Sequence, residues 1–235
     1  MAPELGVVLD PGSSPGAWRR VREQAERAVD AGAASVWLPE AGDPVPVLAA
    51  LSQLVDVRLG MAGVAVGRRP LTVLAKELAG LDVISHGRLE VAVGGGPGSS
   101  ADPADVAEVL DVLGGLMAGG PFDYSGRLAS ARGARCLPPS TQRPHPPLWI
   151  AGSSQALVEL AAARADGWLA AGDYGDSDRL AVLTRHFDAA CGRAGRDPAD
   201  VRRGVLTPAP WDRLTAETER WAESGVSLVL VAPGR

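Results

Sequence analysis

The sequence predicts an α/β fold, a single (β/α)₈ barrel of the TIM type that occupies one domain over residues 1–235. Short aliphatic and β-branched runs alternate with longer stretches of helical period, which favours parallel strands joined by crossover helices. Eight such runs occur, the number that closes a TIM barrel. The rival architecture is an open dinucleotide-binding sheet. The absence of Gly-x-Gly-x-x-Gly after the first run counts against it.

The first half of the chain keeps a regular alternation. The first strand is expected at residues 5–9, and the first helix at 15–31, where apolar residues share one face and Gly32 marks the end. Further strands are expected at 35–38, 57–61 and 88–93, and helices at 44–54, 70–84 and 104–117. Asp102 and Pro103 predict the start of the last of these helices, as its cap and first residue.

The alternation is interrupted at residues 118–147, a stretch rich in glycine and proline. A long ordered excursion of this kind is usually functional. Strands are then expected at 148–151, 167–170, 203–206 and 227–231, and helices at 154–164, 177–194 and 212–224. Because Arg235 closely follows the eighth strand, the barrel is expected to be shortened and to lack its last helix. Apolar outer surface on strands one and eight would then be uncovered, which predicts a homodimer.

Composition excludes several classes of protein. With 46% hydrophobic and 22% charged residues, the chain is expected to fold rather than to be disordered. No apolar run approaches the roughly 20 residues of a membrane helix, and no signal-peptide pattern is present, so a cytoplasmic location is expected. The net charge of −5 is mixed along the chain, which disfavours nucleic acid and anionic membranes as partners. Cys136, Cys191 and the histidines have no pairing or ligand spacing, so neither a disulfide nor a metal site is predicted.

Small residues follow several of the strands, at the end of a TIM barrel where active sites lie. They are Ala62, Gly63 and Val64 after the third strand, Gly94 and Gly95 after the fourth, Gly152, Ser153 and Ser154 after the fifth, and Ala171 and Gly172 after the sixth. Such a rim lets the backbone approach a flat or phosphorylated ligand. The Gly-Ser-Ser run precedes a helix, so it either binds a phosphate or simply caps that helix.

Two carboxylates also stand at strand ends. Asp10 follows the first strand and Glu40 the second. Each is a candidate general base or hydrogen-bonding group, and each has the alternative of a solvated loop or helix cap. His145, within the excursion, is a loop histidine that could reach the rim, whereas His86 and His186 fit no catalytic role.

Two stretches carry distinctive motifs. The first, residues 58–94, contains Ala-Lys-Glu-Leu-Ala and Leu-Asp-Val-Ile-Ser-His-Gly-Arg. The second, residues 137–168, contains Pro-Pro-Leu-Trp-Ile-Ala-Gly-Ser-Ser and Ala-Asp-Gly-Trp. In this order and spacing the motifs resemble the luciferase-like superfamily of bacterial flavin- or coenzyme F420-dependent oxidoreductases and monooxygenases.

The resemblance implies that F420 or FMN is used for hydride transfer to, or monooxygenation of, a small organic substrate. It places the ring over the barrel mouth and the phosphate after the fifth and sixth strands, near Trp149 and Trp168. It also implies a non-proline cis peptide at residues 62–64. Arginines would favour the acidic tail of F420 if the excursion folds over the rim. They are Arg68, Arg69, Arg127, Arg132, Arg135 and Arg143.

Three positions depart from the family pattern. Ala41 replaces a histidine that many F420-dependent relatives carry, Pro97 stands where others have Glu or Trp, and Met117 where relatives tend to have Trp. Two alternatives therefore stay open. One is a non-catalytic flavin-binding protein of the same fold, and the other is a barrel with non-redox chemistry, such as an isomerase.

Overall fold

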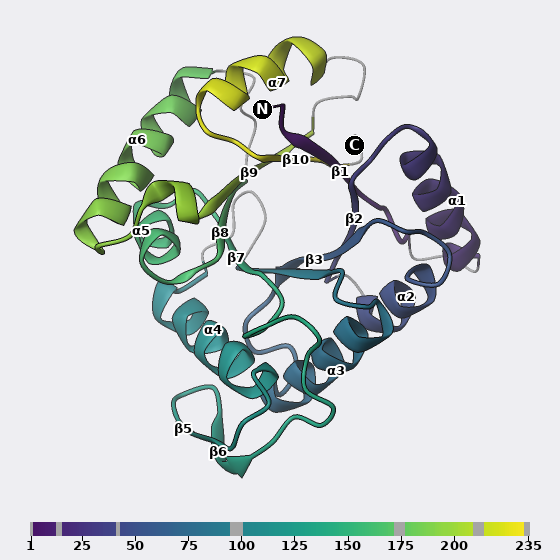
Figure 1. Cartoon of the computed structure of the whole chain (residues 1–235), viewed down its shortest axis with the longest axis vertical. Helices are drawn as coiled ribbons and strands as arrows, with labels where there is room; N and C mark the ends of the chain where they lie inside the picture. Colours follow the sequence, from purple (N-terminus) through teal and green to yellow (C-terminus); the bar gives the residue numbers. More distant parts are fainter. Residues whose placement is uncertain are drawn as a thin grey trace.

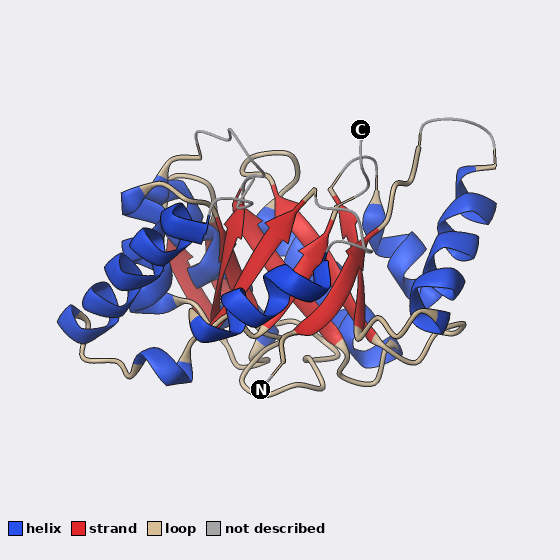
Figure 2. Ribbon diagram, turned by 90° about the horizontal axis from the view of Figure 1, so that it is seen from above, coloured by secondary structure: helices blue, strands red, loops and turns tan. Residues whose placement is uncertain are grey.

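The computed structural model confirms the closed barrel (Figure 1). It describes residues 2–12, 16–40, 43–94, 101–171, 177–208 and 214–232. Within these ranges eight parallel strands close in the order β1-β10-β9-β8-β7-β4-β3-β2, and seven α-helices surround them. The side view shows the strands running together through the molecule, with the N-terminus beside their amino ends and the loops that follow the strands at the opposite end (Figure 2).

The elements match the sequence prediction closely. The barrel strands are β1 (Glu4–Val8), β2 (Ser35–Pro39), β3 (Arg58–Val64), β4 (Leu89–Gly94), β7 (Leu148–Ala151), β8 (Gly167–Ala171), β9 (Arg202–Thr207) and β10 (Leu228–Val231). The helices are α1 (Ala17–Asp30), α2 (Pro44–Leu51), α3 (Leu71–Ile84), α4 (Pro103–Met117), α5 (Gln155–Arg164), α6 (Ser177–Arg193) and α7 (Leu214–Glu223), with a short 3₁₀ turn η1 (Pro198–Asp200) before β9. In the described ranges, no helix is long and apolar enough to cross a membrane.

Two buried tryptophans are the largest side chains in the barrel interior, where they pack with smaller residues such as Leu169 and Leu230. Trp37 on β2 lies opposite Gly60 on β3, and Trp149 on β7 lies opposite Gly167 on β8. A Cβ atom at either glycine would collide with the facing indole ring. Each large ring therefore occupies the space that its neighbour leaves, and the centre of the barrel is packed core rather than a channel.

The excursion forms a two-stranded antiparallel hairpin, β5 (Phe122–Ser125) and β6 (Ser130–Ala134), on the outside of α4 (Figure 1). The buried carboxylate of Glu108 on α4 accepts hydrogen bonds from the amides of Arg127, Leu128 and Ala129, at 3.0, 2.8 and 3.0 Å. Arg127 also pairs with Asp105 on the same helix. Because these contacts hold the turn against α4, the excursion does not fold over the rim, and the basic groove that depended on this is not formed.

No helix follows β10 in the described residues. The apolar outer face of β10 is nevertheless covered, because Val229 and Val231 are only 0% and 8% exposed. They belong to the same apolar cluster as Val21 of α1 and Trp221 of α7, the helices on either side (Figure 1). On β1, Leu5 is half-buried against this cluster. The expectation of an uncovered eighth strand is therefore wrong, whereas Leu5 and Val7 on β1 are only half-buried. The homodimer stays a prediction.

Candidate functional site at the barrel mouth

Small residues form a continuous arc at the carboxyl ends of β3, β4, β7 and β8, which are neighbours in the barrel. A Cβ atom on Gly63 would lie 3.5 Å from the carbonyl oxygen of Gly94, and Gly94 pairs with Ala151. Across the next gap, the hydroxyl of Ser153 donates to the carbonyl oxygen of Ala171 at 3.0 Å. The structure therefore brings the sequence-predicted positions on four strands together. Gly95 and Gly172, like Ala41 and Pro97, lie outside the described residues.

The end of β3 is a β-bulge. The pairing of β3 with β4 shifts register between Met61 and Val64, and Gly63 within the bulge has φ of 74°. The described residues contain cis peptide bonds only at Leu137-Pro138 and Arg143-Pro144, so the implied cis peptide at residues 62–64 is wrong for this chain. The glycine bulge bends the strand there instead. It also turns the side chain of Val64 into the apolar core against the helices, whereas Ala62 faces the barrel interior.

The turn from β7 to α5 is fixed by the protein itself. The hydroxyl of Ser154 accepts a hydrogen bond from the amide of Leu157 at 3.4 Å, so Ser154 is the N-cap of α5. The amide of Gly152 donates to the backbone carbonyl of Leu169 at 3.0 Å, and the carbonyl of Gly152 accepts from the indole of Trp168 at 2.8 Å. The Ser154 hydroxyl thus serves the cap. An anion at this turn would accept hydrogen bonds from the backbone amides of the first turn of α5, where the helix dipole favours negative charge.

Glu40 is buried, only 4% exposed, at the end of β2 beside this arc. Its amide donates to the carbonyl of Ala62 at 3.2 Å, and its carboxylate atom Oε2 accepts from the amide of Ala65. The other carboxylate atom, Oε1, lies 3.8 Å from Nε of Arg69 and has no hydrogen bond among the described residues. Glu40 is therefore not a solvated cap. The Nη1 of Arg68 donates to the backbone carbonyl of Glu40 at 2.9 Å, which fixes the backbone of Glu40 as well.

Arg69 is the cation that balances Glu40, a role that the sequence alone did not suggest. Burial lowers its pKa, but the hydrogen bond with Glu77 and the charges of Glu77, Asp43 and Glu40 outweigh burial and raise the pKa of the guanidinium above its usual value. Nη2 of Arg69 lies 3.6 Å from Oδ1 of Asp43, and Nη1 lies 2.8 Å from Oε2 of Glu77.

Asp10 and His145 lie in positions that serve the fold. Asp10 is exposed; its carboxylate accepts from the amide of Gly12 at 2.9 Å, and its own amide donates to the side chain of Gln24 at 2.8 Å. His145 contacts the carbonyl of Pro146 at 2.9 Å and lies 3.8 Å from Asp166, which precedes β8. These neighbours are at the amino ends of the strands, so the expectation that His145 could reach the rim is wrong.

The two tryptophans expected near the site have different surroundings. Trp168 faces α6, stacks on Phe187 at 5.1 Å between ring centroids, and reaches the β7–α5 turn only through its bond to Gly152. Trp149 lies inside the barrel, where its indole donates to Glu90 at 2.9 Å. Met117, at the end of α4, is fully buried. Trp168 is therefore the tryptophan that contacts the candidate site directly.

A closed (β/α)₈ barrel with small residues at the carboxyl ends of four neighbouring strands defines a class of protein that can hold a flat ligand there. A sequence model described as luciferase-like monooxygenase matches residues 5–229. The chain belongs to this luciferase-like family.

Solved structures share its fold. The coenzyme F420-dependent tetrahydromethanopterin reductase from Methanopyrus kandleri superposes with a TM-score of 0.83 at 15% identity, over 99% of this chain and 93% of that one. An F420-dependent secondary alcohol dehydrogenase in complex with an F420-acetone adduct gives 0.80 at 16% identity, over 99% and 93%. The monooxygenase RslO1 from Streptomyces bottropensis gives 0.70 at 22% identity, over 95% and 79%. At these identities the similarity shows the common fold.

Proposed function

We propose that the chain is an oxidoreductase or monooxygenase that binds F420 or FMN at the carboxyl mouth of the barrel and acts on a small organic substrate. The observation that carries the proposal is the arc of small residues from Ala62 through Gly63, Gly94 and Gly152 to Ala171. Membership of the luciferase-like family supports it.

The residues of the arc fit a flat, phosphorylated group. Gly63 and Gly94 present bare backbone, so a ring can approach the ends of β3 and β4 closely. The first turn of α5 offers backbone amides for a phosphate. When bound, F420 or FMN supplies the hydride or electron transfer. The chain's part is to fix one face of the ring and to keep water from it.

Glu40 is the acid-base candidate of this site. It is buried next to Ala62, with Oε2 held by the amide of Ala65, so its position is fixed before any ligand binds. We expect Oε1, which no described residue hydrogen-bonds, to accept or hold a proton during turnover. The Glu40→Gln change keeps the shape and removes the titratable group.

The test is a binding titration with FMN and, separately, F420, followed by reduction and reoxidation of the bound cofactor. One of the two is expected to bind at micromolar levels, about −8 kcal/mol. Ala62→Leu adds bulk to a side chain that faces the barrel interior at the carboxyl end of β3, and it should weaken binding at least about tenfold. Ala194→Leu adds the same side chain to an exposed position after α6 and should have no effect. Binding of neither cofactor would leave only a barrel with non-redox chemistry.

A second candidate is a cofactor-binding protein without turnover. It is favoured by the engagement of both strand-end carboxylates, Asp10 by its own loop and Glu40 by Ala65 and Arg69. Under this alternative the cofactor binds, but NAD(P)H or a reduced partner protein does not reduce it, and Glu40→Gln leaves the affinity for the cofactor unchanged. Reduction of the bound cofactor that slows in Glu40→Gln would support the enzyme instead.

A further inference from the structure

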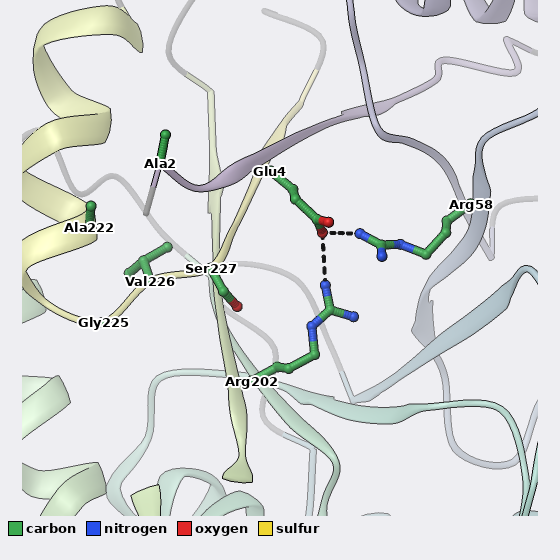
Figure 3. Close-up of a pocket in the computed structure, with 8 residues that line it drawn as sticks. All are labelled: Ala2, Glu4, Arg58, Arg202, Ala222, Gly225, Val226 and Ser227. Carbon is green, nitrogen blue, oxygen red and sulfur yellow. Dashed lines mark hydrogen bonds and ion pairs between the residues drawn. The ribbon is translucent and has the colours of Figure 1, made fainter. Parts of the chain in front are cut away.

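A cavity lies at the amino end of the barrel, opposite the mouth. A pocket of about 670 Å³ opens between the start of β1 and the turn that joins α7 to β10 (Figure 3). It is lined by Ala2, Glu4, Arg58, Arg202, Ala222, Gly225, Val226 and Ser227. Glu4, Arg58 and Arg202 are the first residues of β1, β3 and β9, so the pocket is at the amino end. The packed tryptophan layer separates it from the mouth.

Two arginines meet at one carboxylate in this pocket. Figure 3 shows the guanidinium groups of Arg58 and Arg202 converging on Glu4. The Nη2 of Arg202 donates to Oε2 of Glu4 at 3.1 Å, and Arg58 pairs with the same oxygen. The side chain of Glu4 is 45% exposed, and within the described residues its carboxylate contacts only these two arginines. Glu4 therefore occupies the site from the solvent side.

The arginines themselves are fixed from inside the barrel. Oε1 of Glu90, a residue only 2% exposed, lies 2.8 Å from Nε of Arg58 and 2.9 Å from Nη1 of Arg202. Oε2 of Glu90 accepts from the indole of Trp149, and the guanidinium of Arg202 lies 4.8 Å over that ring. Both cations are thus held in place independently of Glu4, which is the preorganisation that anion recognition requires.

Charge and shape specify the ligand. Arg58 and Arg202 with Glu90 leave one positive charge, which Glu4 neutralises. A single carboxylate can replace that of Glu4 charge for charge, whereas a phosphate dianion would leave an excess negative charge. The wall opposite Arg58 is apolar, formed by Ala2, Ala222 and Val226 (Figure 3). We propose that this pocket binds a small organic monocarboxylate with an apolar body, whose carboxylate displaces Glu4 between Arg58 and Arg202.

The experiment is an amide NMR titration of the whole chain with hexanoate. The amides of Gly225 and Ser227 should shift and saturate, while those of Gly63, Gly94 and Gly152 should not. Glu4→Gln removes the internal competitor and should lower the Kd about tenfold. Glu23→Gln makes the same change of net charge at an exposed site on α1 and should leave the Kd unchanged.

Two further arms test the recognition of the carboxylate. Arg58→Gln should raise the Kd of hexanoate at least about tenfold, with a thermal melt to show that the barrel is intact. Hexan-1-ol has the same apolar body without the charge and should bind at least about tenfold more weakly. Three outcomes would overturn the proposal: equal binding of the alcohol, shifts confined to the mouth, or no saturable binding by either the unmodified chain or Glu4→Gln.

Discussion

The indole N–H of Trp168 donates a hydrogen bond of 2.8 Å to the backbone carbonyl of Gly152. Trp168 is buried and stacks on Phe187 of α6, while Gly152 begins the turn that leads from β7 into α5. The bond therefore connects the core behind β8 to the proposed phosphate site. We therefore expect the placement of this turn to depend on Trp168, whose ring packs against α6.

Trp168→Phe tests that dependence. Phenylalanine can still stack on Phe187 but cannot donate to Gly152, so we expect the free energy of unfolding to fall by about 1–3 kcal/mol. The Kd of the bound cofactor should rise several-fold. Urea unfolding and a cofactor titration measure the two effects. Trp18→Phe, at a half-exposed position on α1, is the matched control and should change neither. Equal cofactor affinities for both variants would show that the bond does not position the turn.

Gly94→Ala should damage the mouth more directly. Gly94 has φ of 105°, and a Cβ atom there would lie 2.6 Å from the carbonyl oxygen of Ala151. Backbone strain and this collision together should lower the free energy of unfolding by about 2 kcal/mol or more and weaken cofactor binding. Gly80→Ala supplies the contrast, because Gly80 is in the interior of α3 with open space around it. It should stabilise the protein by about 0.5–1 kcal/mol in the same unfolding assay. A stable Gly94→Ala variant with normal binding would contradict the proposed geometry.

Glu108→Ala should release the hairpin from α4. Three backbone amides in the turn lose their common acceptor, so we expect the free energy of unfolding to fall by about 2 kcal/mol. Arg127, with a side chain 66% exposed, lies in that turn and is a tryptic site, so cleavage after it should become faster. Asp123→Ala, which removes one exposed bond to the amide of Gly133 in the same hairpin, should have a smaller effect. Equal cleavage rates in the two variants would refute the role of Glu108.

The sequence predicted the barrel because its signals are local. Alternating strand and helix periods located the eight barrel strands and the seven α-helices to within three residues, whereas the hairpin of β5 and β6 was not predicted. The small residues at the strand ends could also be predicted from the sequence, because each lies at the end of a single predicted strand. What these residues bind is not encoded in their spacing, so the site remains a proposal.

Features that depend on distant pairs could not be predicted in this way. The burial of Glu40 requires the amide of Ala65 and the charge of Arg69, which only the β2–β3 pairing brings together. The hairpin position depends on Glu108, whose three partners are 19 to 21 residues away. One signal was available: Glu90 interrupts an otherwise apolar strand at an inward position, a charge that must find partners inside the barrel.

The two buried cysteines predict a loss of stability at alkaline pH. Burial raises the pKa of the thiols of Cys136 and Cys191 above the usual value, although nearby cations partly oppose this. Above a pH of about 8.5 the thiols of the unfolded chain ionise while those of the native chain stay protonated. The unfolded state then binds fewer protons, so the free energy of unfolding falls as the pH rises.

Urea unfolding at a series of pH values from neutral to alkaline measures this loss. The double variant Cys136→Ala/Cys191→Ala should lose stability less steeply with pH than the unmodified chain, although its stability at neutral pH is lower. Thiol labelling of the native protein should be slow at mildly alkaline pH and become fast on unfolding. Parallel pH slopes for the two proteins would show that the thiols are not responsible.

Glu90→Gln should be the most destabilising of the conservative changes at the amino end of the barrel. Glu90 is the buried anion between Arg58 and Arg202, and removing one partner from a buried ion network costs about 3–5 kcal/mol. A double-mutant cycle with Arg202→Gln, followed by urea unfolding, should give a coupling energy above about 1 kcal/mol, because the carboxylate of Glu90 is buried although the side chain of Arg202 is 31% exposed. The exposed pair Arg22 and Glu26 on α1, 3.3 Å apart, should couple by less than about 0.5 kcal/mol. If both cycles give the same small coupling, the arginines are held by packing alone, and the preorganisation inferred for the carboxylate pocket has no electrostatic basis.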